Sequence, residues 1–323
     1  MVLDEMSHKT LVAIILPVYN GGDFLKQSVL SVLNQNFKDF EFFILDDSST
    51  DESYSWLSSI DDPRVTLLRN ETNKGLFYNL NLLVQLTKAP LIKLWAQDDI
   101  MYPYCIEDFI KCFLNHPEVG YIYSARDIID DQGNLKQNDT DDHTPSIITS
   151  AEHAQISYYG GSLAGNISNV AISRKALKKV GTFNEKMKIS GDFDMLVRLA
   201  EHSPTAFIKR KLVQIRNHKG QLSRDRFYNF NHVKEDIEVY NYLNSYVSLS
   251  QQQLGRKILM KQKLIFYYTL FVQSIFVEKD LPLAKQYYRQ LSSFTNFRKL
   301  TYAFILRKLK LTSPGKMKLY RER

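Results

Sequence analysis

The first 130 residues alternate between short apolar runs and segments in which apolar residues recur at helical spacing. The runs are rich in Val, Ile, Leu and Phe and have the length of buried strands. They lie at residues 11–19, 40–45, 65–68, 91–95 and 121–129. The segments between them predict helices over 24–33, 50–60, 76–86 and 106–114. Strands and helices in this order predict an α/β fold, with a mostly parallel central sheet flanked by helices.

Polar residues follow three of the predicted strands at the point where each strand ends. They are Tyr19-Asn20, Asp46-Asp47 and Asp98-Asp99. Ligands of open α/β sheets bind at the carboxyl ends of the strands. The sequence therefore predicts a ligand site where these three clusters meet.

The chain beyond residue 225 differs from the part before it. It is predicted to be helical, and it is aromatic and basic without a further site motif. We therefore expect a site-bearing domain at 1–225 and a helical, basic C-terminal region at 226–323. Of the 42 Lys and Arg residues, nine lie at 298–323 beside a single acid, so the net charge of +7 is a property of this tail. The tail could rest on an anionic membrane surface or pack one helix face on a core.

Neither a membrane span nor a secretory signal is predicted. No run of about 18 apolar residues occurs, and residues 1–10 lack the apolar core of a signal peptide. Cys105 and Cys112 lie seven residues apart on a predicted helix, too far apart to bond to each other. We expect a cytoplasmic protein, with peripheral contact to the inner face of the cell membrane through the basic tail. Nucleic acid is not an expected partner, because no recognition motif accompanies the charge.

The adjacent carboxylates of Asp98 and Asp99 need something that offsets their repulsion. A divalent cation held together with diphosphate oxygens would do so, and carboxylate ligands suit Mg²⁺ or Mn²⁺. The alternative is a solvated helix cap. His218 lies in a short polar loop, where it could complete such a metal site or be an ordinary surface histidine.

Asp192 follows Ser190-Gly191 at the predicted start of a helix over 192–200. As an N-cap, its carboxylate would accept backbone N–H groups of the first turn. A general base needs the same ionised carboxylate within reach of an acceptor hydroxyl. Both interpretations stay open, and Asp194 is a nearby competitor for the role of base.

Taken in order, these motifs resemble those of family 2 glycosyltransferases, which have the GT-A fold. The resemblance spans about residues 10–225 and is carried by Pro17-Val18-Tyr19-Asn20, Leu45–Asp51, Asn73-Lys74-Gly75, Ala96–Ile100, Gly165-Asn166, Ser190–Asp194 and Arg216-Asn217-His218. Each motif is weak or moderate alone, whereas the ordered set is specific. One departure is Ala96, because many family members carry a further acid two residues before Asp98.

The resemblance implies an inverting glycosyltransferase that moves a sugar from a nucleotide diphosphate sugar, by default a UDP-sugar, to a hydroxyl of a saccharide or lipid-linked saccharide. Bacterial surface polysaccharide synthesis is the implied role. The implied donor-binding residues are Pro17, Tyr19, Asn20, Asp46, Asp47, Asn73, Lys74 and Asp98. The resemblance further implies Asn166 and Ser168 in the acceptor region, Asp99 and His218 as ligands of Mn²⁺ or Mg²⁺, and Asp192 as the catalytic base.

Two other functions remain as alternatives. A sugar nucleotidyltransferase shares the layered α/β plan, although the Gly- and Arg-rich loop expected after its first strand is absent. A catalytically silent GT-A scaffold would keep the fold and bind a partner, and Ala96 is the one sequence feature that favours it. A dinucleotide-dependent enzyme is disfavoured, because Asn20-Gly21-Gly22-Asp23 is not the Gly-rich fingerprint.

Overall fold

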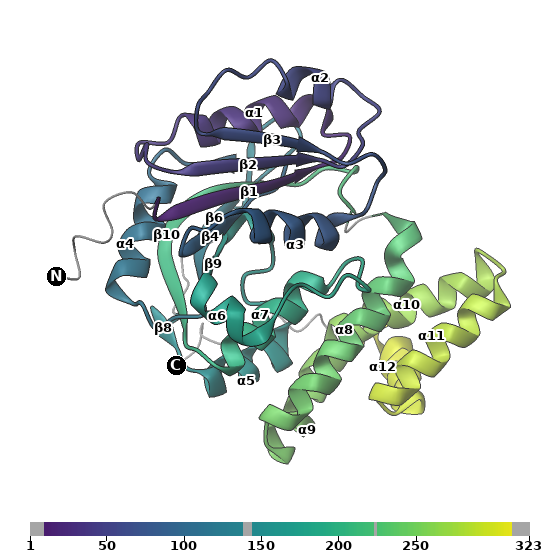
Figure 1. Cartoon of the computed structure of the whole chain (residues 1–323). Helices are drawn as coiled ribbons and strands as arrows, with labels where there is room; N and C mark the ends of the chain where they lie inside the picture. Colours follow the sequence, from purple (N-terminus) through teal and green to yellow (C-terminus); the bar gives the residue numbers. More distant parts are fainter. Residues whose placement is uncertain (1–9, 138–143, 223–224, 312–323) are drawn as a thin grey trace. The chain divides into compact units, whose positions relative to one another are not determined.

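The computed structural model describes residues 10–137, 144–222 and 225–311 (Figure 1), and the chain divides into two compact units. The first unit comprises 1–150, 164–186 and 198–218, and the second comprises 151–163, 187–197 and 219–323. The predicted boundary at 225 does not coincide with this division. Two segments that precede residue 225 belong with the C-terminal helices, because they pack against them.

The first unit holds, in its described part, a ten-stranded sheet. The strands are β1 (Val12–Val18), β2 (Glu41–Asp46), β3 (Val65–Arg69), β4 (Leu91–Leu94), β5 (Ile100–Met101), β6 (Tyr121–Ile129), β7 (Leu135–Gln137), β8 (Ile147–Ile148), β9 (Val170–Ser173) and β10 (Thr205–Arg216). Their order is β3-β2-β1-β4-β9-β6-β10-β5, with β7 beside β6 and β8 beside β10. The predicted strands are therefore present, with ends shifted by a residue or so.

Strand direction divides this sheet into two parts. β3, β2, β1 and β4 are parallel to one another, and β6 is parallel to β10. β9 runs antiparallel between β4 and β6, and the short β5, β7 and β8 are antiparallel as well. The parallel prediction holds for the strands that carry the motifs, while the whole sheet is mixed. The strand–helix alternation on which that prediction rested ends at β6.

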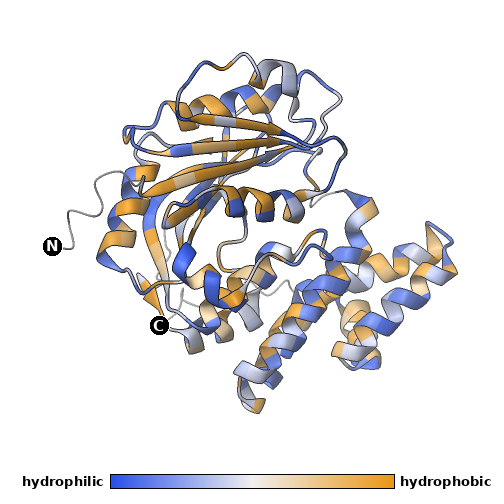
Figure 2. Cartoon of the chain, viewed as in Figure 1, coloured by the Kyte–Doolittle hydropathy of each residue, from blue (hydrophilic) through white to orange (hydrophobic). Residues whose placement is uncertain are grey.

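Helices cover both faces of the sheet. Those of the first unit are α1 (Gly22–Leu33), α2 (Ser53–Leu57), α3 (Leu76–Leu86), α4 (Cys105–Asn115) and α6 (Arg174–Val180). Val12 and Ile14 of β1 share one core cluster with residues of α1 and α4. The helix α3 packs on β1 outside that cluster, through its own buried face. Figure 2 shows how strongly the apolar residues concentrate on the central strands.

Two stretches differ from their predictions. The helix expected over 50–60 is only α2. It begins at Ser53, where Asp51 accepts the backbone N–H groups of Gly22 and Ser53, and it ends at Leu57. The polar stretch over 130–150, for which no strand was predicted, contains the short β7 and β8, and its residues 138–143 lie outside the described part.

The second unit is helical. It contains α5 (Ser150–Gly160), the first turns of α7 (Gly191–Glu201), α8 (Asn229–Leu243), α9 (Leu249–Lys261), α10 (Lys263–Phe276), α11 (Leu281–Phe294) and α12 (Phe297–Lys308). Tyr240 of α8 lies in its aromatic core, in ring contact with Tyr158, Phe193 and Phe294. The helical prediction is therefore confirmed for the described residues beyond 225, which end at 311. In the described residues, no helix combines the length and apolar character needed to cross a membrane.

Candidate active site

The loops that follow β1 and β2 are tied together by hydrogen bonds. The parallel register places Val18 beside Asp46, and Asp47 N–H donates to Val18 O at 2.7 Å. Beyond the strands, Asn20 N–H donates to Ser49 Oγ at 3.0 Å, and Asn20 Oδ1 accepts Thr50 N–H at 2.8 Å. Asn20 has a φ of 48°, a left-handed conformation that Asn adopts more readily than most residues. Two of the predicted motifs thus form one connected surface.

The third motif joins them through Gln97. Pairing between β1 and β4 ends at Ile15 and Leu94, so the two strands separate before Pro17. Gln97 bridges the separation, because its Oε1 accepts Tyr19 N–H at 2.9 Å and its Nε2 donates to Tyr19 O at 3.0 Å. The Tyr19 side chain itself is 45% exposed. Its backbone is fixed while its ring is left open to a ligand, and sequence reasoning missed the role of Gln97.

Asp46 lies at the end of β2 and is fully buried. Its Oδ2 accepts Ser49 N–H at 3.1 Å and lies 3.3 Å from Nε of Arg69, the residue beside it in the β2–β3 register. Its Oδ1 makes no hydrogen bond to the described residues. The cation of Arg69 therefore offsets the charge, and one carboxylate oxygen is left without a protein donor.

Asp47 organises the third predicted motif. Its Oδ1 accepts Lys74 N–H at 2.8 Å and Asn70 Nδ2–H at 2.7 Å, and its Oδ2 accepts Gly75 N–H at 2.9 Å. Gly75 has a φ of 88°, which a residue with a Cβ adopts only under strain. Asn73 and Lys74 are exposed on the resulting turn. Asp47 itself is 2% exposed, so it contributes to the site by holding the backbone of this turn.

Asp98 and His218 form a pair at the carboxyl ends of β4 and β10. Asp98 Oδ2 lies 2.9 Å from His218 Nε2, and their side chains are 20% and 16% exposed. The imidazole packs against the ring of Phe24 at a centroid distance of 4.8 Å. The structure brings His218 to Asp98 rather than to Asp99, its expected partner in a metal site.

Asp99 is turned into the protein and is 1% exposed. Its Oδ1 accepts Arg216 N–H at 2.8 Å, whereas its Oδ2 has no partner of ordinary hydrogen-bond geometry in the described residues. Burial raises the pKa of Asp99 to about 8, and the charge of Asp98 adds to the rise. The Ser168 hydroxyl, the Arg216 N–H and Lys93 oppose it.

Arg216 fixes the Asp98–Asp99 turn from the end of β10. Its guanidinium donates to the carbonyl oxygens of Asp98, Asp130 and Asp131 at 3.0–3.2 Å, and to Gln27 Oε1 at 2.6 Å. It is 2% exposed. Sequence reasoning placed Arg216 in a motif but missed this role. An arginine that ends a long apolar strand was the available signal, because a buried guanidinium needs several acceptors.

The donor atoms around Asp98 can be compared with the needs of a divalent metal. Asp98 and His218 offer an oxygen and a nitrogen, and the buried Asp99 Oδ2 lacks a donor. Among the described residues, no three His, Cys, Asp or Glu side chains are grouped closely enough to hold a metal ion. These residues therefore fit a cation that takes its remaining ligands from substrate phosphates and water, as Mg²⁺ commonly does.

The predicted acceptor segment is only partly accessible. Asn166 is half-buried and its Oδ1 accepts Ser168 N–H at 2.7 Å. Ser168 is fully buried, and its carbonyl oxygen accepts a hydrogen bond from the buried Lys93. Burial lowers the pKa of Lys93 to about 8, against the opposing pull of Cys105 and Asp99. As placed, Ser168 supports the sheet, while Asn166 is the member of the pair that reaches the surface.

Asp192 belongs to the second unit. The helix α7 begins at Gly191, so Asp192 lies within its first turn and not at the cap. Its Oδ1 accepts the N–H of Phe193 at 2.7 Å. Burial raises the pKa of Asp192 to about 6. The Phe193 hydrogen bond and the charge of Lys263 oppose this rise, and the charge of Asp236 adds to it.

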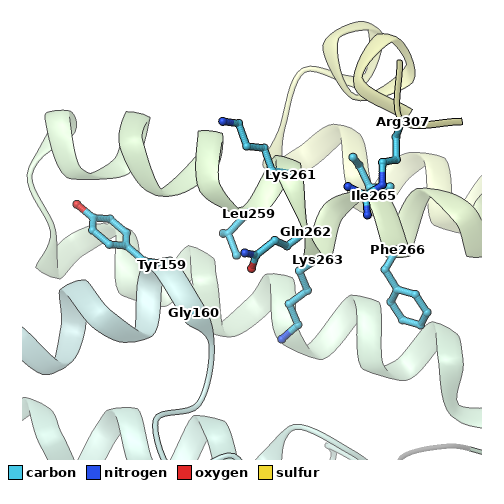
Figure 3. A pocket seen from close by; sticks show the side chains of 9 residues that line it. All are labelled: Tyr159, Gly160, Leu259, Lys261, Gln262, Lys263, Ile265, Phe266 and Arg307. Atoms are coloured by element: carbon cyan, nitrogen blue, oxygen red, sulfur yellow. The ribbon is translucent and has the colours of Figure 1, made fainter. Parts of the chain in front are cut away.

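The second unit also contains a pocket of about 540 Å³. Figure 3 shows the side chains that line it: Tyr159, Gly160, Leu259, Lys261, Gln262, Lys263, Ile265, Phe266 and Arg307. No predicted site residue is among them. The pocket therefore does not mark the chemistry that the motifs predict.

The sequence matches the family model described as Glycosyl transferase family 2 over residues 13–181, just over half of the 323 residues. This chain belongs to that family. It is accordingly a glycosyltransferase, as the ordered motifs predicted. The matched segment contains the motifs from Pro17 to Ser168 and ends before Asp192 and His218.

Individual relatives of this glycosyltransferase cover different parts of its length. An uncharacterized glycosyltransferase of Rickettsia conorii is 27% identical over 221 residues, which is 67% of this chain and 36% of that protein. The chondroitin synthase of Pasteurella multocida is 26% identical over 248 residues, 70% of this chain and 25% of that protein. The chain thus spans little more than a third of the first relative and a quarter of the second.

Solved structures show the same fold. S. aureus TarS 1–349 in complex with UDP-GlcNAc superposes with a TM-score of 0.65 at 16% identity, covering 89% of this chain and 80% of that chain. The likeness confirms the predicted GT-A-like fold with its C-terminal helices.

Proposed function

We propose that this glycosyltransferase moves a sugar from a UDP-sugar to a hydroxyl of a saccharide or lipid-linked saccharide, with inversion at the anomeric carbon. The observation that carries the proposal is the interlocking of the loops after β1, β2 and β4 at one edge of the sheet. The UDP-GlcNAc bound to TarS and the name of the Pasteurella relative, a chondroitin synthase, support this donor and acceptor class. Bacterial surface polysaccharide synthesis is the proposed role.

The donor side of the reaction is assigned to the first unit. We propose that the exposed ring of Tyr19 stacks on the nucleobase and that Asp46 Oδ1 accepts a hydrogen bond from it. Asn73 and Lys74, exposed on the turn held by Asp47, would donate hydrogen bonds to the ribose or the diphosphate. Asp98 faces the ribose or the diphosphate in this proposal. Phosphate contacts of this kind position the donor without specifying its sugar.

A divalent cation, Mn²⁺ or Mg²⁺, is proposed at Asp98 and His218, with Asp99 behind them. The pair provides one carboxylate oxygen and one imidazole nitrogen at 2.9 Å from each other, a donor set that suits these metals together with diphosphate oxygens. When bound, the cation would stabilise the negative charge that grows on the departing diphosphate. Arg216 holds the backbone of this turn in place by its hydrogen bond to Asp98 O.

Asp192 is the proposed base. It would take the proton from the acceptor hydroxyl, and the hydroxyl oxygen would attack the anomeric carbon on the face opposite the nucleotide. The bond between that carbon and the diphosphate oxygen breaks, UDP leaves, and the configuration inverts. A carboxyl whose pKa is raised to about 6 is still ionised at neutral pH and is a stronger base than an ordinary aspartate.

Replacing the base tests the proposal most directly. Asp192→Asn should lower kcat about 10²- to 10⁴-fold, because the amide cannot accept the proton, while the Kd for UDP stays within about twofold. Asp194→Asn, two residues further along the same helix, is the matched control and should keep near-normal turnover. Both quantities are measured by coupled UDP release and by calorimetry with Mn²⁺ present. Normal turnover in Asp192→Asn would place the base elsewhere.

The same assay separates the alternatives. A glycosyltransferase releases UDP, whereas a sugar nucleotidyltransferase releases pyrophosphate, so the released product identifies the bond that breaks. A catalytically silent scaffold would release neither. Absence of binding to any nucleoside diphosphate with Mn²⁺ or Mg²⁺ would favour the scaffold.

Peripheral membrane contact is a further part of the proposal. On α12 and the residue after it, Tyr302, Ile305 and Leu309 are exposed at helical spacing on one face, and Arg307 and Lys308 lie in the last turn. Residues 312–323 of the basic tail lie outside the described part. Tyr302→Ser/Ile305→Ser in the full chain should weaken sedimentation with vesicles containing phosphatidylglycerol several-fold. Equal binding of variant and wild type would contradict the contact.

A further inference from the structure

One carboxylate of helix α8 holds the backbone that leads into the proposed base. Glu235 accepts three consecutive N–H groups, from Lys188 at 2.8 Å, Ile189 at 2.9 Å and Ser190 at 2.8 Å. It is 3% exposed. Charge-assisted hydrogen bonds of this kind are stronger than neutral ones, and three donors on one carboxylate leave the segment little freedom. The residues just before Asp192 are therefore fixed by a side chain 45 to 47 positions later.

The neighbouring carboxylate, Asp236, binds the same segment through the side chain of Ser190. Asp236 Oδ1 accepts the hydroxyl of Ser190 at 2.6 Å. Its Oδ2 accepts the hydroxyl of Tyr267 and is paired with Lys263, both from α10, and His232 lies 3.6 Å away. Burial favours the neutral acid, but Lys263, His232 and the hydrogen bonds outweigh burial and lower the pKa of Asp236. Asp236 is thus a buried anion that links α10 to Ser190.

We propose that Glu235 and Asp236 are positioning residues for sugar transfer, which hold Asp192 in its reactive orientation through the backbone and side chain of residues 188–190. The inference rests on the proposed role of Asp192 as the base. Helix α8 lies outside the segment that matches the family, and the motifs carry no residue of it. The C-terminal helices then serve the reaction instead of only extending the fold.

The geometry explains why such anchors are needed. Asp192 lies in the first turn of α7, just beyond the anchored residues, so a shift of the backbone at Ser190 moves its carboxylate. A displacement of about 1 Å can lower a rate about a hundredfold when reacting groups must be aligned. Phe193, on the other side, packs against Tyr240 of α8 at 5.8 Å. The base is thereby held from both sides of the chain by the same helix.

Two substitutions in the full-length protein test the anchors. Glu235→Gln keeps the size of the side chain but replaces one accepting oxygen with an amide that cannot accept the N–H groups. Ser190→Ala removes only the hydroxyl bond to Asp236. We expect kcat to fall about tenfold to a hundredfold in Glu235→Gln and a few-fold in Ser190→Ala, with the donor KM within about twofold of wild type. Glu238→Gln is the matched control on the same helix, since Glu238 is half-exposed and only pairs with Lys234 at 3.8 Å; it should keep wild-type kcat.

A pH profile adds a readout that a merely structural role would not move. Asp236→Asn removes the anion that raises the pKa of Asp192 and leaves the cation of Lys263, which lowers it. His232, Tyr240 and Tyr267 surround the same cluster. The midpoint of the acid limb of kcat should therefore shift to lower pH in Asp236→Asn. It should stay in place in Glu238→Gln.

The outcomes are distinguishable. Wild-type kcat and an unshifted acid limb in folded Glu235→Gln, Ser190→Ala and Asp236→Asn would overturn the inference. Should Glu235→Gln fail to fold, as its circular dichroism and melting curve would reveal, Ser190→Ala and Asp236→Asn decide the matter. If Asp192→Asn keeps normal turnover, the proposed base fails. If Asp192→Asn is inactive while the α8 variants are normal, only the positioning role fails.

Discussion

The turn at Lys74-Gly75 in the first unit and the segment before Asp192 in the second are held by the same kind of contact. The accepting carboxylate lies at different distances along the chain in the two cases. In both, a buried carboxylate accepts consecutive backbone N–H groups and thereby sets a turn. Asp47 does this for Lys74 and Gly75, and both partners lie within the predicted motifs. Glu235 does it for residues 188–190 from a helix that carries no motif. The segment before Asp192 is therefore anchored by a helix that lies outside the residues matched by the family model.

Arg216 of the first unit and Lys263 of the second differ in how their charges are compensated. Arg216 is satisfied by carbonyl oxygens and an amide oxygen of the loops around it. Lys263 is satisfied by an ion pair with Asp236. Loss of a cation from an ion pair leaves a buried charge behind, whereas loss from a set of carbonyl groups leaves buried dipoles. Loss of Lys263 should accordingly cost more stability than loss of Arg216.

The largest effect, on the free energy of unfolding, is expected for Lys263→Met. It leaves the buried carboxylate of Asp236 without the cation of Lys263. A broken buried pair costs about 3–5 kcal/mol in the free energy of unfolding, and because the Lys263 side chain is 28% exposed we expect the lower end, about 3 kcal/mol. Lys263→Met/Asp236→Asn removes both charges and should recover a large part of that loss. Urea unfolding followed by fluorescence gives both values. A loss below about 1 kcal/mol in the single variant would contradict the contrast between the two cations.

Arg216→Met should have a smaller effect on stability, about 2 kcal/mol, because it leaves carbonyl oxygens of Asp98, Asp130 and Asp131 without a donor. Its effect on the donor KM should exceed that of Lys263→Met, since Arg216 fixes the Asp98–Asp99 turn. Parallel kinetics of the two variants measure this difference. An equal rise of the donor KM in both would remove the assignment of donor binding to the first unit.

The smallest expected effect is the dependence of kcat on pH. The pKa of Asp192 is raised to about 6, and a base must be ionised, so kcat should be constant above that pH and fall as the pH drops through it. At pH 5 about a tenth of the neutral-pH rate should remain, the effect of one pKa unit on a single group. Calorimetric titration of UDP over the same range is the control and should show no transition with this midpoint. A rate independent of pH between 5 and 8 would argue against Asp192 as the base.

Much of the donor side could be predicted from the sequence, because polar residues directly follow the apolar runs there. Continuous apolar runs locate the strands, apolar residues at helical spacing locate the helices, and parallel strands bring their carboxyl ends to one edge. Tyr19, Asp46 and Asp98 were expected at that edge on this ground, and β1, β2 and β4 place them there. The family, by contrast, was indicated by the resemblance of the ordered motifs, and the family model matches residues 13–181.

Side-chain directions, by contrast, were decided by tertiary contacts. Asp99 could not be recognised as inward-facing, because Arg216, 117 residues later, supplies the N–H that it accepts. The pairing of His218 with Asp98 and the burial of Ser168 likewise depend on strands that approach from distant parts of the chain.

The role of α8 was missed although one signal was present. Asp236 lies on the stripe formed by the buried Val233, Ile237 and Tyr240, and a carboxylate on an apolar helix face needs a buried partner. The sequence by itself determined the strands, which follow from local periodicity, and the order of the motifs, through which the chain resembles its family. The tertiary structure alone decided which carboxylates face a ligand and which hold the backbone, because a buried charge takes its role from the partners that folding brings to it.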